Sequence, residues 1–197
     1  MVVKKHACYK AAKSGDPDAA FQLVRDSISE AVIEQLGKTL GFRNPILESV
    51  HAVEDSGVNA IPEALAEVLA NRLGWNMDSG IVQNNIVGHT GANGFVRLAR
   101  QPKFAGPVIP GACYVLVDDF VGQGGTLANL RSHIVLGGGQ VVGATVLTGK
   151  PYSARLVLQS ETLLALRSKH GDEIEDWWRR RFGFGFERLT ESEAHYL

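Results

Sequence analysis

The chain has 197 residues, of which 45% are hydrophobic and 21% charged, and its formal net charge is −1. This length and composition suit one globular domain over residues 1–197 with a buried core. No apolar run approaches the ~20 residues that a membrane helix needs, and the near-zero charge disfavours a general nucleic-acid binder.

The N-terminal residues, MVVKKHACYKAAKSGD, lack the long apolar stretch and the small-residue cleavage site of a secretory signal. The two cysteines, Cys8 and Cys113, lie far apart in the sequence and do not suggest a disulfide framework. We therefore expect a protein of the reducing cytoplasm.

The first predicted element is a helix that begins at Pro17, because Asp16 is a suitable N-cap and proline is favoured at the first helical position. Apolar residues then recur at helical spacing, and Gly37 is the expected end of this helix. The recurring residues are Phe21, Val24, Ile28 and Val32.

A strand, a loop and a second helix follow. The apolar run at 46–53 predicts the strand, and the sequence EDSGVNA at 54–60 predicts the loop. Pro62 begins the helix and Gly74 ends it. These elements form a strand–loop–helix unit.

A short strand is predicted at 80–87. The segment 88–112 holds five glycines and three prolines with little regular pattern, which inside a compact domain is typical of a functional or mobile segment. The next run, CYVLVDD at 113–119, is continuously apolar until its acids, as in a strand covered on both faces. A helix is predicted from about Gly125, and an apolar strand at 140–149 follows it.

Strands that alternate with helices indicate an α/β fold, with a central and mostly parallel sheet flanked by helices. Ligands of such sheets bind beyond the carboxyl ends of the strands. The loops at 54–60 and 118–125 both lie at such ends.

The last part of the chain differs in character from this core of about 46–150. Residues 153–171 and 172–183 are predicted to form two helices, and acids at the start and arginines at the end of the second complement its dipole. Thr190 and Glu193 have the spacing of a capping box, which predicts a short terminal helix. We therefore expect a helical C-terminal tail over residues 151–197.

The turn that follows the strand at 113–119 has the composition of an anion site. Glycines let the backbone approach phosphate oxygens, and the first N–H groups of the next helix have no partner. It is neither a dinucleotide G-x-G-x-x-G, since Leu127 stands at the third glycine position, nor a Walker A loop, since it has no lysine. The preceding acids, Asp118 and Asp119, would repel a phosphate unless ribose hydroxyls or Mg²⁺ lay between them.

Residues 115–127, VLVDDFVGQGGTL, closely resemble the PRPP-binding motif of type I phosphoribosyltransferases. The resemblance implies the fold of that family and the role of each motif residue. Asp118 and Asp119 would bind the ribose 2′- and 3′-hydroxyls. The turn would hold the 5′-phosphate through Val121, Gly122, Gln123, Gly124, Gly125 and Thr126.

The family also binds pyrophosphate on an earlier loop, whose counterpart here is EDSGVN, centred on Asp55, Ser56 and Gly57. A flexible loop closes over the site in relatives, and residues 88–107 stand in its place. Its candidate cations are Arg97, Arg100 and Lys103, which would act beside the acids in catalysis. The alternative is an ordinary solvated basic loop.

The implied cofactor is Mg²⁺, carried by PRPP and with Asp118 as a candidate protein ligand. The resemblance places base recognition at Phe120, Thr148 and Lys150, under a hood formed by the N-terminal helix or the tail. Gly122 stands where relatives acting on 6-oxopurines usually carry an acid, which argues against that specificity. Aromatic residues of the tail would stack a base or, alternatively, form the core that docks the tail or a dimer contact; they are Trp177, Trp178, Phe182, Phe184 and Phe186.

The resemblance thus implies an enzyme, a Mg²⁺-dependent glycosyltransferase that moves a 5-phosphoribosyl group between pyrophosphate and a nitrogenous base. The alternative is a non-catalytic regulator of the same fold that binds PRPP or a nucleotide. In either case, the expected partners of the protein are PRPP and a small base or nucleotide. Neither nucleic acid nor a membrane is indicated as a partner. Members of the family are often homodimers.

Overall fold

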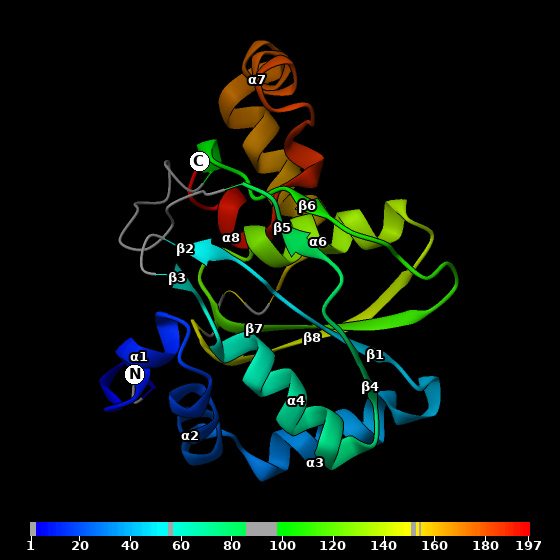
Figure 1. Ribbon diagram of the computed structural model, residues 1–197. Coiled ribbons are helices and arrows are strands. Elements are labelled where there is room, and N and C mark those ends of the chain that lie inside the picture. Colours follow the sequence, from blue (N-terminus) through cyan, green and yellow to red (C-terminus); the bar gives the residue numbers. More distant parts are fainter. Residues whose placement is uncertain (1–2, 55–56, 86–97, 151–152, 154) are drawn as a thin grey trace.

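The computed structural model describes residues 3–54, 57–85, 98–150, 153 and 155–197. Its centre is a four-stranded parallel sheet with the strand order β4-β1-β7-β8 (Figure 1). The strands are β1 (Ile46–Ser49), β4 (Asn76–Asp78), β7 (Cys113–Val121) and β8 (Gln140–Gly149). Helices flank the sheet, so the predicted α/β class with a mostly parallel sheet is confirmed.

Strand β7 lies between β1 and β8, and its apolar run is buried on both faces. Val115 and Val117 face a cluster built from α2 (Pro17–Ser27), α3 (Glu30–Leu40) and α4 (Ile61–Leu73). On the other face, Tyr114 and Leu116 pack with α6 (Gly125–Leu136). Burial on two faces explains why this strand reads as an unbroken hydrophobic run rather than an alternating one.

The chain begins with η1 (Val3–Lys5) and the short helix α1 (Tyr9–Lys13), which packs against α2. The side chain of Asp16 caps α2 by accepting from the backbone N–H of Ala19 at 3.0 Å, as predicted. The single helix expected from Pro17 to Gly37 is wrong. Ile28 and Ser29 have extended backbone angles and separate α2 from α3.

Gly37 does not end a helix, because α3 continues through it to Leu40, before η2 (Gly41–Arg43). A Cβ atom at Gly37 would lie only 3.1 Å from Cδ2 of Leu73 on α4. This glycine therefore serves close helix packing, whereas Gly74 ends α4 in the left-handed conformation, as predicted.

Two predicted strand boundaries are corrected, and one strand is additional. The strand expected at 46–53 ends at Ser49, and β2 (Val53–Glu54) pairs antiparallel with β3 (Gly57–Val58). Within 80–85, the described part of that range, the strand is β5 (Val82–Gln83), and it pairs with β6 (Phe104–Ala105) in the segment expected to be irregular. Strand β4 was not predicted, since three residues are too few for a periodic signal.

The tail contains α7 (Ser160–Phe182), η4 (Phe186–Arg188) and α8 (Glu191–Ala194). Gly171 interrupts α7 with a non-helical φ of 73° and ψ of 171°, which divides it at the predicted point. The helix expected from residue 153 begins only at Ser160. The capping box of Thr190 and Glu193 is confirmed.

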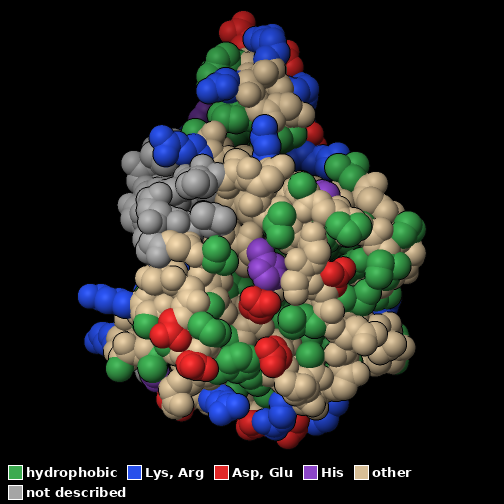
Figure 2. Space-filling view, viewed as in Figure 1, with side chains coloured by type: hydrophobic (Ala, Val, Ile, Leu, Met, Phe, Trp, Pro, Cys, Tyr) green, Lys and Arg blue, Asp and Glu red, His purple; other side chains and the backbone are tan. Residues whose placement is uncertain are grey.

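An aromatic cluster holds the tail together. Trp178 lies 4.4 Å from Phe182 and 5.8 Å from Phe186 between ring centroids, and Leu98 joins the same core. The predicted docking core is therefore present, although Trp177 is half exposed. Lysines and arginines lie beside acids over the surface of α7 (Figure 2). None of the described helices is long and apolar enough to cross a bilayer.

Candidate functional site

In the glycine turn between β7 and α6, the backbone carbonyl groups are engaged as hydrogen-bond acceptors. Each carbonyl from residue 121 to residue 125 accepts a hydrogen bond. The donors are, in chain order, the N–H of Lys150 at 3.2 Å, the hydroxyl of Ser153, the hydroxyl of Thr190 at 2.6 Å, the N–H of Ala128 at 2.9 Å and Nδ2 of Asn129 at 2.8 Å. Three of these five donors belong to the segment that follows β8.

The N–H groups of the same turn are open. Within the described part of the chain, the N–H groups of residues 122–126 have no hydrogen-bond acceptor. Gly124 is the N-cap of α6 with a φ of 86°, and the helix dipole adds partial positive charge at this end. The turn therefore offers unpaired donors on its open side, as an anion cradle does.

The tail packs directly on this turn. A Cβ atom at Gly124 would lie 2.5 Å from Cδ2 of Leu156, and one at Gly125 would lie 2.5 Å from Oε1 of Glu193. A side chain at either position would displace its neighbour in the tail, and the positive φ of Gly124 is a second reason for glycine there.

Asp118 and Asp119 are neighbours in sequence but point to opposite faces of the sheet. Strand alternation places Asp118 on the face of Leu116 and Asp119 on the face of Val117. Both are largely buried, with 7% and 8% of their surface exposed, and Oδ1 of Asp118 accepts from the N–H of Asp119 at 2.8 Å. Burial, together with the adjacent charge of Asp119, raises the pKa of Asp118 well above its usual range.

Asp119 has a cationic partner that sequence reasoning missed. Nζ of Lys13, at the end of α1, lies 3.3 Å from Oδ2 of Asp119 across 106 positions of the chain. A second lysine of the N-terminal segment, Lys4, lies 4.3 Å above the ring centroid of Phe120. Neither lysine stands in a recognisable motif, so only the fold reveals that this segment reaches the end of β7.

The expected pyrophosphate loop is described only in part. Asp55 and Ser56 lie outside the described residues, whereas Gly57 has a φ of 124° and packs against Ser14. A Cβ atom at Gly57 would lie 2.7 Å from the carbonyl oxygen of Ser14. This loop therefore abuts the residue that follows Lys13.

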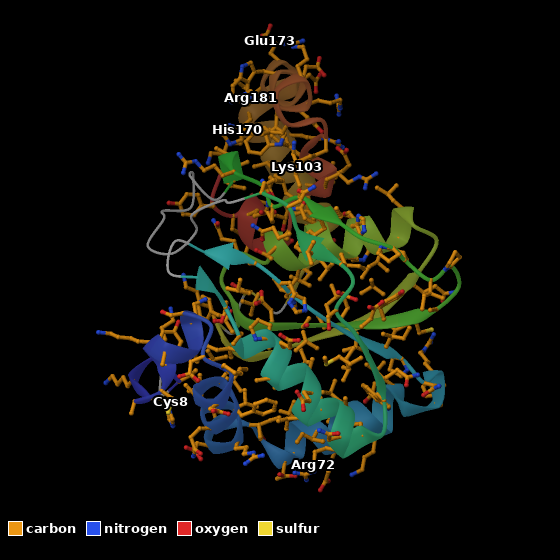
Figure 3. All side chains as sticks on the ribbon, viewed as in Figure 1. Cys8, Arg72, Lys103, His170, Glu173 and Arg181 are labelled. Atoms are coloured by element: carbon orange, nitrogen blue, oxygen red, sulfur yellow. The ribbon has the colours of Figure 1, made fainter. Side chains whose placement is uncertain are left out.

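Two of the three candidate cations of the basic segment lie within the described residues. Arg97 lies outside the described residues. Arg100 is exposed, as is Lys103, whose backbone pairs with Asn84 and Asn85. Figure 3 shows Lys103 on the α7 side of the molecule, away from Cys8 in the N-terminal segment. Their catalytic role stays a prediction.

The three expected base-binding residues converge at the carboxyl ends of β7 and β8. Phe120 pairs with Thr148 across the two strands, and Lys150 follows directly after β8. Phe120 is half buried. This grouping lies beside the glycine turn, and its role in base binding stays a prediction.

Glu48 on β1 is a buried acid that sequence reasoning did not single out. It is fully buried, and neither carboxylate oxygen has a partner in good hydrogen-bond geometry among the described residues, although the backbone of Ile81 lies close enough to oppose the rise in its pKa. Burial, followed by the charge of Asp78, raises its pKa to about 9. Glu48 therefore holds its proton at neutral pH.

The described residues contain no group of three or more histidine, cysteine, aspartate or glutamate side chains that could hold a metal ion. Asp118 and Asp119 offer two adjacent carboxylates at the end of β7. Because the two face opposite sides of the sheet, either one could serve as the single protein carboxylate of a Mg²⁺ bound mainly by phosphate oxygens of a ligand.

No family model matches the chain. It is 42% identical over 189 residues to protein TraN of Escherichia coli, covering 96% of this chain and 42% of that protein. It is 39% identical over 130 residues to an uncharacterized protein of Haemophilus influenzae, covering 66% of this chain and 29% of that protein. The chain thus matches less than half the length of either relative.

Two solved structures are similar to the chain. One is an adenine phosphoribosyltransferase from Thermoanaerobacter pseudethanolicus, with 18% identity and a TM-score of 0.43, covering 71% of this chain and 75% of that one. The other is a purine phosphoribosyltransferase from Pyrococcus horikoshii, with 21% identity and a TM-score of 0.41, covering 64% of this chain and 76% of that one. Likeness at this level assigns neither an activity nor a substrate.

Proposed function

We propose that the chain is a phosphoribosyltransferase, which transfers a 5-phosphoribosyl group from PRPP to a nitrogenous base. The observation that carries this proposal is the turn after β7. Its carbonyls accept hydrogen bonds, whereas the N–H groups of residues 122–126 have no acceptor among the described residues. Two carboxylates stand directly before it. A sugar phosphate matches both features, because its phosphate needs donors and its hydroxyls need acceptors.

In the proposed complex the 5′-phosphate accepts from the N–H groups of residues 122–126. The amide of Gln123 adds a donor, since its buried side-chain atoms have no partner among the described residues. Asp119 accepts from a ribose hydroxyl on one face of β7, and Asp118 serves the other hydroxyl or the metal. The turn and the acids together fix the sugar at the ends of β7 and β8.

The reaction breaks the bond between C1′ and the pyrophosphate oxygen, and the pyrophosphate leaves with the electron pair. A ring nitrogen of the base forms the new bond to C1′ and loses its proton. Lys13 lies beside Asp119 and next to the loop of Gly57, so its ammonium would offset the charge of the leaving pyrophosphate. Phe120, Thr148 and Lys150 would contact the base. Bound Mg²⁺ supplies charge neutralisation on the phosphate oxygens.

A second candidate function is a regulator that binds PRPP or a nucleotide without turnover. The ion pair between Lys13 and Asp119 favours it, because the proposed ribose acid already has a partner. Gly122 favours it too, since it leaves no acid near the base.

Pyrophosphate release separates the two functions. The protein is incubated with PRPP, Mg²⁺ and a panel of purine and pyrimidine bases, and pyrophosphate and PRPP binding are both measured. Release with one base identifies the enzyme. Binding without release identifies the regulator, and absence of both overturns the site.

The variant Asp119→Asn tests the ribose role. It removes the charge that accepts from a hydroxyl, and we expect PRPP to bind about tenfold more weakly, as for a hydrogen bond to a charged group. Asp26→Asn is the matched control, because Asp26 also pairs with the N-terminal segment, through His6 at 3.0 Å. Equal affinity of the Asp119 variant and the control would contradict the assignment.

A further inference from the structure

Two hydroxyl groups of the tail hold the glycine turn from one side. The hydroxyl of Ser153 donates to the carbonyl oxygen of Gly122, and that of Thr190 donates to the carbonyl oxygen of Gln123 at 2.6 Å. Both side chains belong to residues with no exposed surface. These bonds join positions 31 and 67 residues apart, so they are contacts of the fold and not of the local sequence.

The two bonds fix two successive peptide planes. In a planar trans peptide the C=O and the next N–H point in opposite directions. When the tail holds the carbonyls of Gly122 and Gln123, the N–H groups of Gln123 and Gly124 point away from the tail. Those two N–H groups are among the open donors of the turn.

Thr190 is itself fixed. Its hydroxyl oxygen accepts from the N–H of Glu193 at 3.1 Å, and its own N–H donates to Oε2 of Glu193 at 2.9 Å. The hydroxyl has one proton, and its oxygen is already engaged by the capping box, so that proton is directed to Gln123. The capping box of α8 thus reaches the turn through a single side chain.

We infer that Ser153 and Thr190 are positioning residues of the phosphate cradle. They act through the carbonyls of Gly122 and Gln123 and set the direction in which the N–H groups of Gln123 and Gly124 donate to the 5′-phosphate. This role rests on the proposed function, since it assumes that the turn binds a phosphate. In this role the tail orients the phosphate cradle, which is a different role from that of a hood over the base.

Three variants test the role. Ser153→Ala and Thr190→Val each remove one hydroxyl, whereas Thr190→Ser keeps both the cap and the donor. Thr162→Val is the matched control, because the Thr162 hydroxyl donates at 2.6 Å to Glu191 inside the tail and does not contact the turn. The probes are ribose 5-phosphate and PRPP, titrated into ¹⁵N-labelled protein.

In the wild type we expect ribose 5-phosphate to shift the amide proton resonances of Gln123 and Gly124 downfield. Ser153→Ala should reduce the shift at Gln123, and Thr190→Val the shift at Gly124, with binding about three- to tenfold weaker in each. Thr190→Ser should restore both the shift and the affinity, and Thr162→Val should change neither. A general loosening of the tail would not produce this residue-by-residue pattern.

Wild-type affinity and unchanged shifts at Gln123 and Gly124 in both folded variants would overturn the positioning role and leave the proposed function standing. Failure of the wild type to bind either probe would overturn the proposed function, and the positioning role with it. If Thr190→Val does not fold, Ser153→Ala decides, because it leaves the backbone bond from Ser153 to Lys150 intact.

Discussion

Asp118 and Asp119 lie near the carboxyl end of β7, and they differ in their surroundings. Asp118 is enclosed on the α6 face with a raised pKa, whereas Asp119 faces α1 and pairs with Lys13. Successive side chains of a strand point to opposite faces of the sheet, so the two neighbouring acids have different environments. In the proposed complex Asp119 accepts from a ribose hydroxyl beside Lys13, whereas Asp118 lies on the opposite face of the strand.

Glu48 supports a prediction about pH at the same scale. Its pKa is about 9 in the folded chain against 4.5 when unfolded, so between these values the folded state holds a proton that the unfolded state releases. Stability should therefore fall as pH rises, by at most about 1.4 kcal/mol per pH unit from this group. Glu48→Gln should flatten this slope and stabilise the protein at pH 8. Urea midpoints from pH 5 to pH 8 measure both effects.

The control for this experiment is Glu34→Gln. Glu34 is exposed on α3 and pairs with the equally exposed Lys38 at 3.4 Å, so its replacement should leave the slope unchanged. A Glu48 variant with the wild-type slope would show that Glu48 does not hold its proton in the fold.

Elements with a local signal were predictable. The β7–α6–β8 unit has apolar runs separated by glycines, and α4 has a proline start and a glycine stop. Those signals depend on neighbours in the sequence, and tertiary packing does not oppose them here. The turn at the end of β7 was identified for the same reason.

Other features depend on packing between distant segments. Gly37 reads as a helix stop, yet it lies inside α3, where a Cβ atom would come within 3.1 Å of Cδ2 of Leu73 on α4. Thr190 was predicted as a cap of α8 but not as a donor to Gln123. Lys13 and Glu48 carry no motif, and only sheet order and helix docking give them their partners.

The break in α7 gives a prediction at the scale of one element. Gly171 has a φ of 73° and a ψ of 171°, a region open only to glycine, and a Cβ atom there would have nothing within 4 Å. Gly171→Ala should therefore cost about 1–3 kcal/mol through backbone strain alone. The thermal midpoint, followed by tryptophan fluorescence, measures it.

Gly41→Ala is the matched control, since Gly41 has a φ of −56° and equally open surroundings. We expect its midpoint to stay at or slightly above the wild-type value. An unchanged midpoint for Gly171→Ala would instead mean that α7 runs through this position without a break.

Across the whole molecule, the buried acids of the sheet and Glu175 of the tail respond to pH with opposite signs. Glu48 and Asp118, both in the sheet, have raised pKa values, so acid does not remove their contributions. In the tail, Arg167 donates to Glu175 at 2.7 and 2.9 Å, and Phe186 N–H donates at 3.1 Å. The hydrogen bonds from Arg167 are the main cause that lowers the pKa of Glu175 to about 2.

A group with a lowered pKa stabilises the fold above its unfolded value and loses that effect as pH falls. For Glu175 this window extends from about 4.5 down to about 2. We expect acid to loosen the tail before the sheet. Hydrogen exchange at pH 3 and pH 6, corrected for intrinsic rates, should show lost protection at Phe186 and retained protection in β7.

Glu175→Gln provides the comparison. Its tail should be less protected at pH 6 and should lose little more at pH 3, because the titrating group is gone. If the wild type lost protection equally in β7 and in the tail, this would contradict the prediction that acid loosens the tail before the sheet.

The ion pair between Lys13 and Asp119 has a consequence for how a ligand would enter. Since the acid is already neutralised within the fold, a sugar hydroxyl would join or replace the ammonium rather than meet a bare charge. Entry would then be an exchange of partners, in which the ammonium of Lys13 leaves the acid and turns towards the phosphates of the ligand. The N-terminal helix would act as a built-in counterion whose position reports whether the site is filled.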